Sequence, residues 1–178
     1  MKATGMVRRI DDLGRVVIPK EIRRTMRIRE GDPLEIFTDK EGELIFKKYS
    51  PIGELSDFAG QICESIKKAT DGIAAVCDRE NIIAIAGGAK KELLDKPVSR
   101  QLADIMEKRT VFLGTGAALP AAEGEEKYRV SVAAPVTAEG DVLGCVLFID
   151  GKDTSSCGEL ERKLAETVAV FLGKQMEA

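Results

Sequence analysis

Hydrophobic residues near the start of the chain fall in two short runs that favour β-structure. The runs are Val7–Ile10 and Arg15–Ile18, and turn-forming residues at 11–14 separate them. This pattern predicts a β-hairpin. With Ile10 opposite Arg15, the period of two along each strand places four side chains on one face of the ribbon: Arg8, Ile10, Arg15 and Val17. Arg8 and Arg15 then become diagonal neighbours.

A helix and a second hairpin are expected next. Pro19 suits the first turn of a helix, and the apolar residues Ile22 and Met26 stand four apart in the predicted helix 20–28. At about 100° per residue, the face away from Ile22 is basic. It carries Lys20, Arg23, Arg24 and Arg27. The runs 34–37 and 44–46 surround turn-forming residues and predict a second hairpin.

A domain boundary is predicted near residue 50, where a strand-like run meets Pro51 and Gly53 before a helical pattern begins. We therefore expect one domain at 1–50 and another at 51–178. The hydrophobic pattern of the second domain predicts helix 55–69, strands 72–77 and 82–86, helix 99–108, strands 111–113, 129–136 and 142–149, and helix 157–176. Strands and helices mixed in this way predict an α+β fold.

Charge divides the chain at the same boundary. Residues 1–50 hold 12 lysines and arginines against 9 acidic residues, whereas residues 51–178 hold 15 against 21. A basic segment on an acidic body indicates a polyanionic partner at one end only.

Several classes of chemistry are disfavoured by composition. The chain contains no histidine, which removes Ser–His and Cys–His nucleophile activation and the commonest transition-metal ligand. Its cysteines form no C-x-x-C pair, and we interpret them as buried thiols: Cys63, Cys77, Cys145 and Cys157. No run of about 18 apolar residues could span a bilayer, and the first residues contain no apolar signal core. We predict a cytoplasmic protein with no catalytic residue, metal or cofactor and no membrane partner.

The size of the first domain predicts a dimer. A domain of about 50 residues buries little apolar surface and is marginal without a disulfide, a metal or a partner. Homodimerisation would supply the missing core and would duplicate the arginines across a two-fold axis. Guanidinium groups bind phosphate oxygens in bidentate fashion, so the duplicated arginines would suit the polyanionic partner that the charge distribution indicates.

The sequence of this domain also resembles a known family. Residues 4–26 read T-G-M-V-R-R-I-D-D-L-G-R-V-V-I-P-K-E-I-R-R-T-M, and residues 28–36 read I-R-E-G-D-P-L-E-I. These runs resemble the AbrB-type transition-state regulators. The resemblance implies a β-barrel-like dimer module with swapped, interleaved hairpins and DNA contacts by Arg8, Arg15, Arg23 and Arg24. We add Arg9, Lys20 and Arg27 as candidate DNA contacts; Arg27 stands where many relatives carry Gly.

The second domain resembles a different family. Its order of elements and the segment A-P-V-x(5)-V-L-G-C-V-L at residues 134–147 are similar to GAF-type sensor domains. That resemblance implies an α/β sandwich with an antiparallel sheet, terminal helices that dimerise on one face, and a small-molecule ligand on the other. The expected assembly is a dimer through residues 1–50 and a tetramer through residues 51–178. The pairing of the two domains resembles sporulation regulators of endospore-forming bacteria, which implies a nucleoid-associated regulator of late forespore genes.

Three alternatives remain. Some swapped-hairpin proteins are antitoxins, but those use a disordered acidic tail where this chain has a folded domain. A purely architectural DNA binder would use residues 51–178 only as an oligomerisation clamp. Some GAF relatives are thiol-based sulfoxide reductases, which would require a reactive thiol at Cys77, Cys145 or Cys157; their spacing gives no support for that reading.

Overall fold

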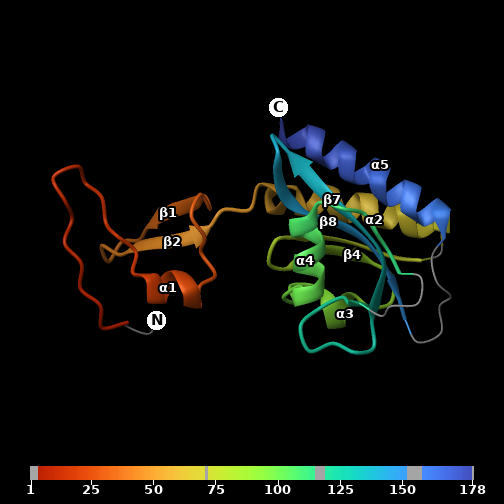
Figure 1. Cartoon of the computed structure of the whole chain (residues 1–178), viewed down its shortest axis with the longest axis horizontal. Helices are drawn as coiled ribbons and strands as arrows, with labels where there is room; N and C mark the ends of the chain where they lie inside the picture. The colour runs from red at the N-terminus through yellow and green to blue at the C-terminus, as the bar shows by residue number, and fades with distance from the viewer. Residues whose placement is uncertain (1–3, 71, 115–118, 152–157, 178) are drawn as a thin grey trace. The chain divides into compact units, whose positions relative to one another are not determined.

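The structure is a computed structural model that describes residues 4–70, 72–114, 119–151 and 158–177 (Figure 1). The chain divides into two units, Met1–Tyr49 and Ser50–Ala178. The first holds a two-stranded sheet and the second a six-stranded sheet. The division falls at the start of the 3-10 helix η1, Pro51–Leu55, where the Ser50 hydroxyl oxygen accepts a hydrogen bond from the backbone N–H of Gly53 at 3.2 Å.

The second predicted hairpin is confirmed in the first unit. It consists of β1, Leu34–Thr38, and β2, Leu44–Lys48, which are antiparallel. Asp39 and Glu43 close the loop between them, since the backbone N–H of Asp39 donates to the carbonyl of Glu43 at 3.2 Å.

The first predicted hairpin is present only as a turn. Within residues 4–19 the chain turns at 12–14 but forms no strand ladder. Gly14 has a φ of +75° and closes a three-residue loop, in which the backbone N–H of Asp11 donates to the carbonyl of Arg15 at 3.1 Å. The predicted pairing of Ile10 with Arg15 is therefore wrong. Since residues 4–19 form no ladder, the structure does not define strand faces there, and the shared face of Arg8 and Arg15 stays a prediction.

The first helix is shorter than predicted. α1 comprises Lys20–Thr25, whereas the hydrophobic spacing predicted a helix over 20–28. Arg27 has a left-handed φ of +53°, and the backbone N–H of Ile28 donates to the carbonyl of Arg23 at 2.7 Å. This is a Schellman ending, whose left-handed residue is usually Gly. The prediction that Arg27 lies on the helix face is wrong, because the helix ends before it.

The second unit is built on an antiparallel sheet. Its strands are β3 (Ile73–Asp78), β4 (Ile82–Ala86), β5 (Phe112–Leu113), β6 (Leu119–Pro120), β7 (Arg129–Ala138) and β8 (Asp141–Asp150). The order across the sheet is β4-β3-β8-β7-β5, with β6 also paired to β7. The predicted strands 72–77, 82–86, 129–136 and 142–149 are confirmed. They form the hairpins β3–β4 and β7–β8, which the pairing of β3 with β8 joins.

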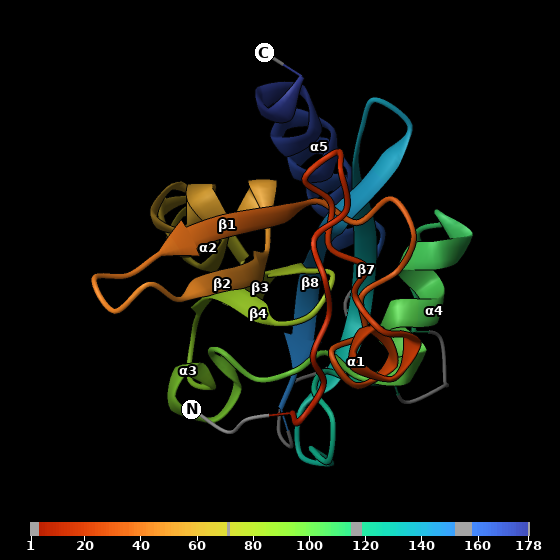
Figure 2. The same ribbon diagram turned by 90° about the vertical axis from the view of Figure 1, so that its left-hand side faces the viewer.

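Helices cover both faces of this sheet (Figures 1 and 2). They are α2 (Ser56–Thr70) and α5 (Glu159–Met176) on one face, and α3 (Lys90–Leu93) and α4 (Arg100–Lys108) on the other. Alternate residues of β3 serve the two layers: Ala74 and Val76 pack on the α2 and α5 side, Ala75 and Cys77 on the α3 and α4 side. The predicted α+β class with an antiparallel sheet is confirmed.

Two glycines allow backbones to approach closely in this unit. A Cβ atom on Gly144 of β8 would lie 2.0 Å from the carbonyl oxygen of Cys77 in β3. One on Gly173 of α5 would lie 2.2 Å from the carbonyl oxygen of Thr137 in β7. Because both neighbours are backbone atoms, a side chain at either position would have to displace a strand or a helix.

Candidate nucleic-acid interface

All seven basic residues predicted to contact DNA are exposed in the first unit. They are Arg8, Arg9, Arg15, Lys20, Arg23, Arg24 and Arg27. The helix α1 brings three of them together, since Lys20, Arg23 and Arg24 fall within an arc of about 100° at helical spacing. Arg8 and Arg9 precede the turn at 12–14, and Arg15 follows it directly. Arg27 stands beyond the end of the helix and remains a candidate by its charge.

The basic face of α1 is fixed to the rest of the unit through its ends. Ile22 lies on the opposite face and is half-buried. Beyond the helix, the ammonium group of Lys48 in β2 donates to the carbonyl oxygen of Arg27 and lies 3.9 Å from the Asp32 carboxylate. The second hairpin therefore holds the C-terminal end of α1.

The turn before Arg15 holds that arginine through a carboxylate. One oxygen of Asp11, Oδ1, accepts hydrogen bonds from the backbone N–H groups of Leu13 at 3.0 Å and Arg15 at 2.8 Å. The other, Oδ2, accepts from Nε of the Arg15 guanidinium at 2.8 Å. These bonds, first from the backbone of Arg15 and then from its side chain, lower the pKa of Asp11. The sequence pattern identified Asp11 only as a turn former and missed this contact.

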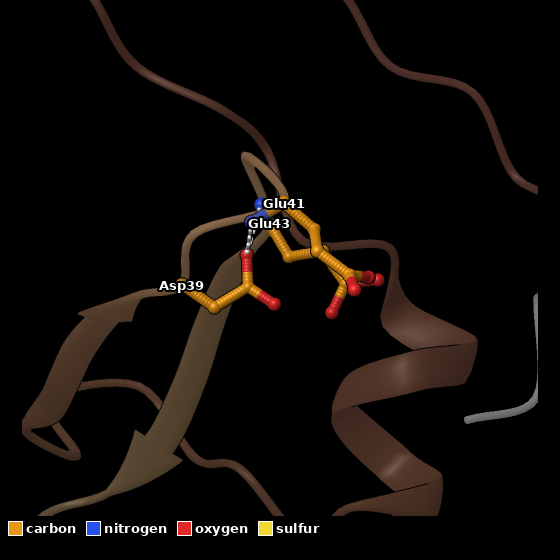
Figure 3. Close-up of side chains that lie close together, drawn as sticks. All are labelled: Asp39, Glu41 and Glu43. Carbon is orange, nitrogen blue, oxygen red and sulfur yellow. Dashed lines mark hydrogen bonds between the residues drawn. The ribbon is translucent and has the colours of Figure 1, made fainter.

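An acidic cluster at the tip of the second hairpin is a turn rather than a metal site. The carboxylates of Asp39, Glu41 and Glu43 offer ligand atoms within 4.8 Å of one another, and all three residues are exposed (Figure 3). Oδ1 of Asp39 is already bound to the backbone N–H groups of Glu41 at 3.0 Å and Glu43 at 2.8 Å (Figure 3). The cluster therefore follows from the way Asp39 caps the loop.

The three cysteines of the second unit that the structure describes are unsuited to thiol chemistry. Cys63, Cys77 and Cys145 are free and buried, and Cys157 lies outside the described residues. Burial raises the pKa of the Cys63 thiol to about 12, and burial also raises the pKa of Cys77 and Cys145. Because the thiolate is the reactive form, these three side chains are inert at neutral pH.

Solved structures share the fold of the second unit. The second GAF domain of DevS from Mycobacterium smegmatis is 12% identical, with a TM-score of 0.52 over 68% of this chain and 92% of that one. The GAF domain of a phosphoenolpyruvate-protein phosphotransferase from Coxiella burnetii is 18% identical, with a TM-score of 0.51 over 68% of this chain and 82% of that one. The predicted GAF fold is confirmed.

Sequence comparison decides the family. Residues 54–177 match the model described as stage V sporulation protein T C-terminal, transcription factor. Over 99% of its length the chain is 49% identical to 99% of stage V sporulation protein T of Bacillus subtilis strain 168. The chain belongs to the stage V sporulation protein T family. It is a sporulation transcription factor rather than an enzyme, and this family gives no support to the sulfoxide reductase alternative.

The first unit of this family member has its own relatives. Residues 7–54 match the model described as antidote-toxin recognition MazE, bacterial antitoxin. The transition state regulatory protein AbrB of Bacillus subtilis strain 168 is 56% identical over 63 residues, which cover 32% of this chain and 65% of that protein. The predicted AbrB-like character of the first unit is confirmed. Within the described residues no helix is both long and apolar enough to cross a membrane.

Proposed function

We propose that this transcription factor binds double-stranded DNA as a symmetric dimer of residues 1–50, in the cytoplasm and on the nucleoid. The observation that carries the proposal is the exposure of seven basic side chains within residues 8–27. The contacts are proposed to be Arg8, Arg9, Arg15, Lys20, Arg23, Arg24 and Arg27. The divided charge of the chain supports a polyanion contact at this unit, since residues 51–178 carry an excess of acidic groups.

The exposed apolar residues of the first unit support a dimer. Val7, Ile10, Leu13 and Val17 are between 67% and 88% exposed in the single chain. Pairing of these extended segments with strands of a second copy would bury the apolar side chains. It would also satisfy the backbone N–H and C=O groups that form no strand ladder in the single chain. The proposed partner is therefore a second copy whose hairpin interleaves with this one.

Salt dependence tests the proposal on the full chain. The probe is the DNA duplex that the chain enriches most from a random-sequence pool, here called the selected duplex. If two copies of Arg8, Arg15, Arg23 and Arg24 each neutralise a phosphate, affinity is expected to fall about 10³- to 10⁵-fold between about 50 and 200 mM salt. Fluorescence anisotropy measures the affinity. A fall of less than about tenfold would mean that these charges are a solvated surface.

A second self-association surface is proposed on the second unit. Apolar side chains of α2 and α5 form a strip, which we call the helical strip: Phe58, Ile62, Leu160, Leu164, Val168 and Phe171. Leu160 is 63% exposed and Phe171 44% exposed, and the rings of Phe58 and Phe171 lie 5.9 Å apart between centroids. Burial of this strip against a second copy would join two DNA-binding dimers into a tetramer.

The variant Phe171→Glu is expected to convert the tetramer into a dimer. Burying an aromatic side chain contributes about 1.5–3 kcal/mol, and a two-fold interface contains it twice, so the tetramer dissociation constant should rise at least about 100-fold. Light scattering after size exclusion measures the mass. Val170→Glu is the matched control, because Val170 is 60% exposed but lies on the charged face of α5 with Lys163 and Glu166. Equal masses for the two variants would contradict the proposed surface.

A small-molecule ligand on the opposite face of the sheet stays a prediction. That face is filled by side chains from α3, α4 and the segment before β7. Leu93, Leu102, Met106 and Tyr128 are all buried there. A ligand would have to displace some of these side chains, so the proposed function does not depend on one.

A further inference from the structure

The first unit contains the same turn twice. Both copies follow the pattern Asp-x-x-Gly-x, at residues 11–15 and 39–43. In each, the Asp Oδ1 accepts from the backbone N–H groups two and four residues later, at 3.0 and 2.8 Å in both turns. In each, the glycine has a positive φ, +75° at Gly14 and +84° at Gly42. Both turns therefore share the bonds to Asp Oδ1 and a left-handed glycine.

The two turns differ in what the second carboxylate oxygen does. In the first turn the residue after glycine is Arg15, and its Nε donates to Oδ2 of Asp11 at 2.8 Å. In the second turn the same position holds Glu43, whose side chain has no guanidinium N–H to donate to Asp39. The bond to Arg15 is thus additional to what the turn requires.

This bond orients an exposed guanidinium. The Arg15 side chain is 71% exposed, and Asp11 is the one side chain that pairs with it among the described residues. With Nε held by Asp11, the terminal Nη1 and Nη2 groups remain as donors at the far end of the planar fork. Those are the donors that form bidentate contacts with phosphate oxygens or with a guanine edge.

We infer that Asp11 is a positioning residue for Arg15 in DNA recognition, its Oδ1 fixing the turn and its Oδ2 fixing the guanidinium. The inference rests on the proposed function, because it requires Arg15 to contact DNA. Holding the side chain in advance reduces the rotamer freedom that is lost on binding. Asp11 therefore promotes binding to a polyanion although it carries a negative charge.

Charge and positioning predict opposite results for Asp11→Asn. By charge alone, removing a carboxylate near DNA should raise affinity. By positioning, the asparagine keeps Oδ1 for the turn but places an NH₂ group where Oδ2 accepted from Arg15. We expect affinity for the selected duplex to fall about 5- to 100-fold in a dimer that contains the contact twice.

Asp39→Asn is the matched control in the full chain. It removes the same charge from the same unit, in the second copy of the turn. That copy has no arginine at its fifth position. Its affinity is expected to equal or exceed that of the unmodified chain. Thermal unfolding of both variants shows whether each turn is retained. Should Asp11→Asn unfold the first unit, Arg15→Lys tests the same contact, because lysine keeps the charge but lacks Nε and should weaken binding by a similar factor.

The variant Arg15→Ala distinguishes the contact of Arg15 with DNA from the positioning role of Asp11. We expect Arg15→Ala to weaken binding to the selected duplex, and adding Asp11→Asn to it to cause no further loss. If Arg15→Ala weakens binding while Asp11→Asn or Arg15→Lys matches the unmodified chain, the positioning role is overturned and the proposed function stands. If Arg15→Ala has no effect, the proposed contact of Arg15 with DNA falls, and the positioning role falls with it.

Discussion

Arg24→Ala is expected to reduce affinity for the selected duplex by about 30-fold or more at constant salt. An arginine contact with DNA contributes about 1–3 kcal/mol, and a symmetric dimer loses two contacts for each substitution. The helix α1 presents Arg24 beside Lys20 and Arg23 on an exposed face. The salt dependence of binding should also become shallower, because fewer counterions are released.

The stability of the Arg24→Ala protein should be almost unchanged. Arg24 is exposed, and substitutions at such positions usually alter the free energy of unfolding by less than about 0.5 kcal/mol. Lys108→Ala serves as the control, since Lys108 is an exposed cation on α4 in the acidic second unit. Its DNA affinity should match that of the unmodified chain. Loss of folding in Arg24→Ala, or equal DNA binding by both variants, would contradict the role assigned to Arg24.

Gly144→Ala is expected to destabilise the second unit by about 3 kcal/mol or more. The added Cβ would lie 2.0 Å from the carbonyl oxygen of Cys77 and 3.0 Å from Cα of Asp78. Overpacking of a core usually costs about 1–3 kcal/mol, and here the obstacle is backbone in the pairing of β3 with β8 at the centre of the sheet. Strand separation is the only relief, so the cost should reach the upper end of that range or exceed it.

Gly60→Ala, which is the same chemical change, is expected to stabilise the second unit. Gly60 lies inside α2, and a Cβ atom there would meet nothing within 4 Å. Alanine is favoured over glycine in a helix by about 1 kcal/mol, so this variant should be more stable than the unmodified chain. Urea unfolding followed by circular dichroism measures both variants. A Gly144→Ala protein as stable as the unmodified chain would show that β3 and β8 are not so closely paired.

Long periodic segments made most of the fold predictable. The long apolar runs of β7 and β8, and the helical spacing in α2 and α5, predicted those elements to within a few residues. Short elements contain too few residues to show a hydrophobic periodicity. The pattern predicted neither the four-residue α3, Lys90–Leu93, nor the two-residue β6, Leu119–Pro120.

The details of the DNA-binding unit depended on backbone conformations that residue type alone did not reveal. A left-handed Gly14 gives the first turn three residues, which changes the register that was predicted to align Arg8 with Arg15. A left-handed Arg27 ends α1 early, although arginine is a good helix former. Charge and resemblance selected the candidate arginines, and their contacts with DNA stay a prediction. Their faces could not be predicted, because one residue of register or one residue of helix length changes the side on which a side chain lies.

The repeated turn makes one position of the first unit open to evolutionary change. Aspartate and glycine specify the backbone, whereas the fifth position carries Arg15 in one copy and Glu43 in the other. A single codon change at such a position can reverse the charge displayed beside the loop while leaving its path intact. Related regulators could thus diverge in the DNA they prefer without first acquiring a new scaffold.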